Sequence, residues 1–262
     1  MSAMINPFKE GSQAATPWLP KVRPKAGTEI RLFCFPYAGG ATHTYRNWQA
    51  LLPPEIEVCP VEPPGRGARV GEPPETRLTR LIETMTPALL PYLDKPFALF
   101  GHSMGGLISF EFARELRRLR RPQPVHMFIS ACRPPHRRRS PQRITYDLPE
   151  PEFIDELRCL GGIPEEVLEE RELMQLIFPL LRADFEVCQT YEYVPEPPLA
   201  CPLTVLGGLQ DTELSRGELK EWREQTTSTG VVRMLAGDHL FVNTAQPLIL
   251  QILADELGTY LP

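Results

Sequence analysis

The chain has 262 residues, of which 42% are hydrophobic and 23% are charged, and its formal net charge is -5 at pH 7. This composition is typical of an ordinary globular protein, and the length suits one α/β unit with a large core. The negative charge argues against general nucleic-acid binding, and no apolar stretch approaches the ~20 residues that a membrane-spanning helix requires.

Residues 1–27 lack the apolar core of a secretory signal, and we expect them to form a loosely held N-terminal arm. The six cysteines are scattered and include no C-x-x-C pair. Cysteines in such a pattern are usually reduced and buried, where they pack as small hydrophobic residues. We therefore expect a cytoplasmic protein without a metal site or a disulfide framework.

From residue 30 onward, strand-like and helix-like segments alternate. Short apolar runs that favour strands occur at 30–35, 56–65 (with a turn at its end), 96–100, 125–131, 202–208 and 231–237. Helix-like segments lie between or after them, at 42–54, 76–93, 105–119 and 244–257. This alternation predicts an α/β fold with a mainly parallel sheet covered by helices on both faces.

The segment 147–198 interrupts the alternation. It contains no convincing strand and reads as several helices with proline-rich ends. An insertion of this length between two sheet strands is more often functional than simple padding, so we expect a helical lid. The core would then consist of residues 28–146 and 199–262.

A serine between glycines is the strongest motif. Gly101-His102-Ser103-Met104-Gly105 matches G-x-S-x-G and lies between a predicted strand and a predicted helix. Glycines on both sides allow a sharp turn that exposes the hydroxyl at the carboxyl edge of the sheet, near the N–H groups of the helix N-terminus. This context favours Ser103 as a nucleophile over an ordinary turn serine.

A serine nucleophile needs a histidine base, and His239 is the best candidate. It follows a predicted strand in a glycine-containing loop, whereas His126 begins a strand and His136 lies among arginines. His102 adjoins the serine, but its side chain should point away from the hydroxyl on so tight a turn. We expect it to pack or to hold the loop.

The base in turn needs a carboxylate to orient it, and Asp211 is favoured. It follows the predicted strand 202–208 by a few residues, which places it on the same sheet edge as Ser103. Asp238 adjoins the base too closely to fold back on it, and Asp184 belongs to the helical insertion. The order serine, acid, histidine is that of the strand–turn–helix architecture.

The oxyanion of a tetrahedral intermediate needs backbone donors. One should be the N–H of Met104, which follows the nucleophile, and the other should come from FPYAGG after the first strand. There the N–H of Tyr37 or of Ala38 could point inward, and Gly39 and Gly40 would let the main chain approach the substrate.

FCFPYAGG, VEPPGRGAR, FGHSMGG, TVLGGLQD and GDHLFV together resemble the type II thioesterases, from about residue 30 to the end of the chain. These stand-alone α/β-hydrolases serve polyketide and nonribosomal peptide synthases. The resemblance implies an α/β-hydrolase fold with a helical lid, and Ser103, Asp211 and His239 as nucleophile, acid and base. It also implies hydrolysis of acyl groups from the phosphopantetheine of acyl or peptidyl carrier proteins, which removes stalled groups.

The chain departs from the family pattern in two places: GDHLFV carries Asp238 where a second glycine is common, and PPGRGAR has proline where leucine is common. Neither change affects a reacting group. No metal or organic cofactor is implied, because a thiol is a good leaving group. We expect a monomer.

Carrier proteins are usually acidic, and two arginine clusters could steer one toward the site. The first surrounds the end of the helix after Ser103, and the second lies in the loop before the lid; they comprise Arg114, Arg117, Arg118, Arg120 and Arg121, and Arg133, Arg137, Arg138 and Arg139. A solvated helix end and loop would explain them equally well. Arg66 and Arg69 could shape the site mouth or simply form a turn.

Two other functions remain open at this point. An esterase or lipase acting on oxyesters would use the same three residues, although such enzymes often carry an HGGG-type loop where this chain has PYAGG. A non-catalytic hydrolase fold used only for binding is disfavoured, because all three candidate catalytic residues are present.

Overall fold

The computed structural model describes residues 15–22, 25–139, 144–160, 163 and 165–262. Within these residues six strands form one parallel sheet in the order β2-β1-β3-β4-β5-β6. Their bounds are β1 Ile30–Phe35, β2 Ile56–Pro60, β3 Phe97–His102, β4 His126–Ser130, β5 Leu203–Gly208 and β6 Gly230–Leu235. The parallel sheet predicted from the alternation is confirmed.

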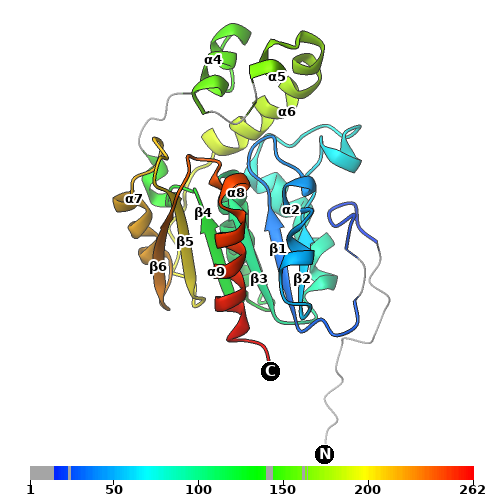
Figure 1. Cartoon of the computed structure of the whole chain (residues 1–262), viewed down its shortest axis with the longest axis vertical. Helices are drawn as coiled ribbons and strands as arrows, with labels where there is room; N and C mark the ends of the chain where they lie inside the picture. Colours follow the sequence, from blue (N-terminus) through cyan, green and yellow to red (C-terminus); the bar gives the residue numbers. More distant parts are fainter. Residues whose placement is uncertain (1–14, 23–24, 140–143, 161–162, 164) are drawn as a thin grey trace, which may run out of the picture.

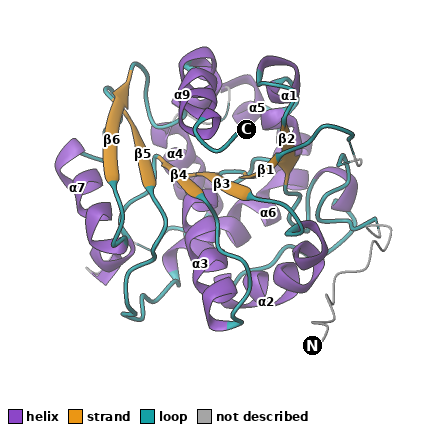
Figure 2. Ribbon diagram, turned by 90° about the horizontal axis from the view of Figure 1, so that it is seen from below, coloured by secondary structure: helices purple, strands orange, loops and turns teal. Residues whose placement is uncertain are grey.

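Helices cover both faces of this sheet. Figure 2 shows α9 (Gln246–Gly258) and α1 (Trp48–Leu51) on one face, and α2 (Leu78–Leu89) and α3 (Met104–Arg118) on the other. The five strands from β1 to β5 are buried along their whole length, which explains their continuous apolar runs. The edge strand β6 is largely exposed until Leu235.

The helix expected at 42–54 is broken into a 3-10 turn, Thr42–Tyr45, and the single-turn helix α1. Aromatic packing accounts for the break. The Tyr45 hydroxyl donates to the carbonyl oxygen of Phe35 at 2.7 Å, and the rings of Tyr45 and Trp48 both meet Phe100 edge to face. Burying both rings against the sheet stabilises the structure more than a continuous helix would.

The described part of the N-terminal segment is not loosely held. Trp18 and Leu19 are buried in the main core, and the Trp18 carbonyl accepts the N–H of Glu62 at 2.8 Å. The guanidinium of Arg69 lies 4.3 Å from the centre of the Trp18 ring. Residues 15–22 are therefore attached to the core; residues 1–14 and 23–24 of the expected arm lie outside the described residues.

Among the described residues, three α-helices separate β4 from β5: α4 (Glu150–Leu160), α5 (Glu165–Glu169) and α6 (Arg171–Gln189). Figure 1 shows them together at one end of the sheet. They share a small hydrophobic core of their own, formed by Phe153, Leu157, Leu168, Met174 and Leu181. Most described residues of 147–198 are thus helical, as the sequence pattern predicts, whereas residues 190–198 form no helix.

Candidate active site

Ser103 occupies a strained turn between β3 and α3. Its backbone has φ 53° and ψ -113°, a conformation that residues other than glycine rarely adopt. A Cβ added to Gly101 would lie 2.0 Å from the carbonyl oxygen of Gly105, and one added to Gly105 would lie 2.0 Å from that of Phe35. The G-x-S-x-G pattern is therefore a steric requirement of this turn.

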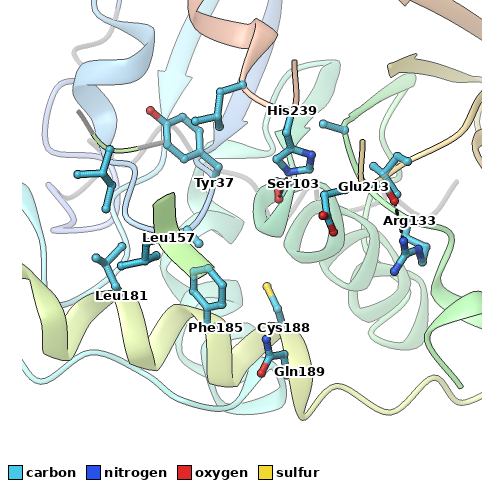
Figure 3. Close-up of a pocket in the computed structure, with 15 residues that line it drawn as sticks. Tyr37, Ser103, Arg133, Leu157, Leu181, Phe185, Cys188, Gln189, Glu213 and His239 are labelled. Carbon is cyan, nitrogen blue, oxygen red and sulfur yellow. Dashed lines mark hydrogen bonds between the residues drawn. The ribbon is translucent and has the colours of Figure 1, made fainter. Parts of the chain in front are cut away.

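The serine, histidine and aspartate predicted from the sequence converge at this turn. Nε2 of His239 lies 3.0 Å from Oγ of Ser103, and Nδ1 of His239 lies 2.9 Å from Oδ2 of Asp211. Figure 3 shows the His239 ring directly beside Ser103. These contacts suit proton transfer from the hydroxyl to an imidazole that a carboxylate orients.

The Asp211 side chain is fully buried, yet its surroundings favour the charged form. Burial alone would raise its pKa, but hydrogen bonding to His239 and to the N–H groups of Glu213 and Leu214 outweighs burial and lowers the pKa. The N–H of Glu213 lies 2.8 Å from Oδ1. An ionised Asp211 can stabilise a protonated imidazole.

His102 holds the loop that carries the base, as expected. Its Nε2 lies 2.8 Å from the carbonyl oxygen of His239, and its Nδ1 lies 2.8 Å from Oγ of Ser130. Because a carbonyl only accepts, Nε2 must carry the proton and Nδ1 must accept from the Ser130 hydroxyl. Burial, reinforced by the nearby His239, lowers the pKa of His102 to about 3, so the ring stays neutral.

The other histidines considered as the base, and Asp238, form contacts with other residues. Nε2 of His126 lies 2.9 Å from Oγ1 of Thr204, and Nε2 of His136 lies 3.0 Å from a carboxylate oxygen of Glu221. Asp238 accepts the N–H of Leu240 at 2.8 Å. Of the histidines and acids considered, the structure brings His239 and Asp211 to Ser103.

The segments proposed to bind an oxyanion lie beside the serine. Register pairs Phe35 with Gly101, so the loop after β1 emerges next to the turn at Ser103. Tyr37 and Ala38 line the same cavity as Ser103. In this loop Pro36 has no N–H, and the N–H groups of Gly39 and Gly40 donate to Asp184 and to the Tyr37 carbonyl.

Two backbone N–H groups of the loop, those of Tyr37 and Ala38, thus remain as candidate donors. Met104 is the first residue of α3, where the N–H has no acceptor within the helix. The structure is compatible with the donors predicted from the sequence.

A cavity of ≈ 220 Å³ adjoins Ser103 and His239. Its apolar wall comes from α4, α6 and the loop after β5, through Leu157, Leu181, Phe185, Cys188 and Leu214. Figure 3 shows a more polar side, where Arg133 donates to the carbonyl oxygen of Glu213 at 2.7 Å. A substrate with a flexible apolar group attached to a reactive carbonyl would suit a cavity with one apolar wall and one more polar side.

One buried ion pair at the site was missed by sequence reasoning. Arg66 and Asp184 form two charge-assisted hydrogen bonds of 2.8 and 2.6 Å, and both side chains are almost fully buried. From the sequence, Arg66 could shape the site mouth or simply form a turn, and Asp184 was disfavoured as the acid. No local signal links two residues separated by 118 positions.

Three of the five arginines in the first cluster are paired with acidic side chains. Arg114, Arg117 and Arg118 form ion pairs with Glu111, Glu115 and Glu196. In the second cluster Arg133 pairs with Glu218 and Arg137 with Glu221. The side chains of Arg138 and Arg139 lie outside the described part of the structure.

Within the described residues no helix is long and apolar enough to cross a membrane. The same residues contain no group of three or more histidine, cysteine or acidic side chains arranged to hold a metal ion.

Comparisons with known proteins agree with this geometry. A profile of the thioesterase domain family matches residues 30–257. Linear gramicidin dehydrogenase LgrE of Brevibacillus parabrevis is 44% identical and aligns with 93% of this chain and 94% of its own. Although that name refers to a dehydrogenase, the matching profile is that of thioesterases.

Two solved structures are also similar. RedJ, a thioesterase from the prodiginine biosynthetic pathway in Streptomyces coelicolor, has a TM-score of 0.82 at 35% identity, covering 92% of this chain and 98% of RedJ. The type II thioesterase BorB from the borrelidin biosynthetic cluster has a TM-score of 0.81 at 34% identity, covering 90% and 95%. The chain is therefore a thioester hydrolase with the α/β-hydrolase fold, and it belongs to the thioesterase family, among the type II enzymes of nonribosomal peptide and polyketide pathways.

Proposed function

We propose that the protein removes acyl groups from the phosphopantetheine thiol of acyl or peptidyl carrier proteins, and so unblocks a polyketide or nonribosomal peptide synthase. The observation that carries this proposal is the arrangement of Ser103, His239 and Asp211 beside an apolar cavity. The names of the similar proteins support the pathway context.

In the first half of the reaction, His239 accepts the proton of the Ser103 hydroxyl while Oγ attacks the thioester carbonyl carbon. The negative oxygen that forms is stabilised by the N–H of Met104 together with that of Tyr37 or Ala38. The C–S bond then breaks, and the departing sulfur takes the proton from the imidazolium. An acyl group remains on Ser103.

In the second half, a water gives a proton to His239 and attacks the acyl carbon. Collapse of the intermediate returns the proton to Oγ of Ser103 and releases the carboxylic acid. Every proton transfer uses a side chain already in place, so the scheme needs no metal or organic cofactor.

We propose that residues 147–198 act as a lid over a core formed by 28–146 and 199–262. Support comes from α4 and α6, which supply Leu157, Leu181 and Phe185 to the cavity wall. In this arrangement the lid shapes the acyl chamber, and the core supplies the reacting groups. The enzyme would act as a monomer in the cytoplasm, where the described cysteines stay reduced.

The carrier protein would approach along the second arginine cluster. Arg133 of this cluster lines the cavity beside Ser103, whereas no arginine of the first cluster does. Charge reversal of Arg137 should lower kcat/KM for a carrier-bound thioester and spare a small thioester, and the same change at Arg117 should affect neither. Equal losses on both substrates would reject this docking route.

Mass spectrometry tests the central proposal. After brief mixing with a loaded carrier protein, the wild type should carry an acyl adduct on Ser103, and Ser103→Ala should carry none and release no acid. Full activity of Ser103→Ala, or an adduct elsewhere, would refute the mechanism. A matched oxyester of pantetheine separates the thioesterase from an esterase, because the thioester should be hydrolysed faster.

A further inference from the structure

The buried ion pair between Arg66 and Asp184 joins two distant parts of the chain next to the catalytic serine. Arg66 lies in the turn after β2, and Asp184 lies on the lid helix α6. Only 4% of the Arg66 side chain and 2% of the Asp184 side chain are exposed to solvent. The two hydrogen bonds are parallel, which fixes the orientation of both groups as well as their separation.

The same two side chains hold the loop after β1. Oδ2 of Asp184 accepts the N–H of Gly39 at 2.7 Å, and Nη1 of Arg66 donates to the carbonyl oxygen of Gly40 at 3.1 Å. The loop is therefore fixed through one donor and one acceptor, at the two residues that follow Tyr37 and Ala38. These contacts leave the N–H groups of Tyr37 and Ala38 for another acceptor.

Close packing reinforces this attachment. Gly39 has φ +77°, and a Cβ at this position would lie 2.7 Å from Cδ2 of Leu181, one turn before Asp184 on α6. The positive φ favours glycine at this position, and an added Cβ would also displace the Leu181 side chain. Leu181 also lines the cavity, so one face of α6 contacts the loop and forms part of the cavity wall.

Stability alone is a poor explanation for this pair. Removing two charges from water costs several kcal/mol, and apolar residues of similar size often stabilise a core equally well. A second ion pair between the same helix and the core, Arg77 with Glu186 at 2.7 Å, is more exposed and involves neither Gly39 nor Gly40.

We propose that Arg66 and Asp184 are positioning residues for the oxyanion site: they set the loop after β1 against α6 so that the N–H of Tyr37 or Ala38 faces the developing negative oxygen. This inference rests on the proposed function. Because the donor acts on the transition state, misplacing it should lower kcat more than it raises KM.

Two variants test the proposal. Asp184→Asn keeps an oxygen that can accept the N–H of Gly39 but loses the charge, and the double variant Arg66→Met/Asp184→Leu removes the anchor while leaving no unpaired buried charge. We expect kcat/KM to fall about 100-fold in the double variant, the loss typical of one oxyanion donor, and less in Asp184→Asn. KM should change little in either.

Two inhibitors distinguish a misplaced oxyanion donor from general damage to the active site. An alkylboronic acid forms a tetrahedral adduct on Ser103 whose oxygen enters the oxyanion site, whereas an acyl-pantetheine thioether resembles the substrate ground state. The double variant should lose boronic-acid affinity in proportion to kcat/KM and retain thioether affinity within about 3-fold. Glu186→Gln, the matched control on α6, should leave both affinities and the activity unchanged.

Wild-type kcat/KM in the folded double variant, or equal losses of both inhibitors, would overturn the positioning role. If the double variant does not fold, Asp184→Asn decides between the two outcomes with the same pair of inhibitors. The outcome stays distinct from failure of the proposed function, because that failure would appear as activity in Ser103→Ala.

Discussion

Nε2 of His102 lies 2.8 Å from the carbonyl oxygen of His239, so the residue beside the nucleophile holds the backbone of the base. Nε2 donates in this contact, so in the neutral ring Nδ1 is left to accept from the Ser130 hydroxyl. His102 thus links the turn after β3 to the loop after β6, and its protonation would require the Ser130 hydroxyl to change from donor to acceptor.

The burial of the neutral His102 ring predicts a loss of protein stability in mild acid. The pKa of His102 is lowered to about 3, so between its ordinary value near 6.5 and about 3 the unfolded chain binds more protons than the folded chain. Stability therefore falls as the pH falls through this window. The His102 contribution is about 2 kcal/mol between pH 7 and pH 5.

His102→Gln retains an amide that can donate to His239 but does not titrate. Urea unfolding at pH 7, 6 and 5 should show a smaller decline for this variant than for the wild type. His126, whose pKa burial lowers to about 4, gives both proteins a shared residual decline. Parallel declines in the two proteins would show that His102 does not cause the effect.

Asp211 should be needed for catalysis and Asp238 should not. Asp211→Asn keeps the shape of the contact with Nδ1 of His239 but favours the wrong tautomer and cannot stabilise the imidazolium, so kcat should fall by about 10³–10⁴. Asp238→Asn, whose side chain accepts the N–H of Leu240, should stay within a few-fold of the wild type. Steady-state hydrolysis of an acyl-pantetheine compares the two; similar losses in both would remove Asp211 from the mechanism.

Gly105 should tolerate no side chain. A Cβ there would lie 2.0 Å from the carbonyl oxygen of Phe35, so Gly105→Ala should destabilise the fold by at least about 3 kcal/mol or prevent folding. Gly258→Ala, at the end of α9 with no atom within 4 Å of the added carbon, should be neutral or slightly stabilising. Thermal unfolding measures both; a stable, active Gly105→Ala would contradict the close approach of β1 to α3.

Phe185 should limit the length of the acyl chain. It lines the cavity and packs edge to face on Phe153 at 5.3 Å, so Phe185→Ala should open space toward the lid core. Preference should shift to longer chains, by up to about 4-fold in kcat/KM for each extra methylene that is buried. Phe178→Ala is the matched control, because Phe178 also packs on Phe153, at 5.2 Å, but is absent from the cavity lining. If Phe185→Ala had the same preference for acyl-chain length as the wild type, the acyl chain would not lie against Phe185.

Much of this site could be predicted because its residues sit where local patterns are strong. Ser103 lies between two glycines at a strand-to-helix junction, and Asp211 and His239 each follow a strand of a parallel sheet. In such a sheet the carboxyl ends of the strands share one edge, so residues far apart in sequence are expected to meet. The helix α7 (Arg216–Lys220) was missed although its capping box, Ser215 and Glu218, is readable in the sequence.

Other features depend on packing between segments. Trp18 lies in a polar, proline-containing stretch, and only the three-dimensional structure reveals the surface that buries it. The same holds for Arg66 and Asp184, since a long-range ion pair leaves no periodic trace along the chain. The arginines 114, 117 and 118 looked like a free basic surface because the partner Glu196 lies about 80 positions away, in the segment after α6.

The different contacts of α4, α5 and α6 constrain how this chain could be re-engineered. Helix α6 is fastened to the catalytic edge by Asp184 and Leu181, whereas α4 and α5 pack on it through their own apolar core. Replacing residues 147–170 with those of a relative should change the shape of the proposed acyl chamber and leave the attachment of α6 unchanged. If α6 were exchanged as well, Arg66, which pairs with Asp184 from the turn after β2, would have to be exchanged together with it.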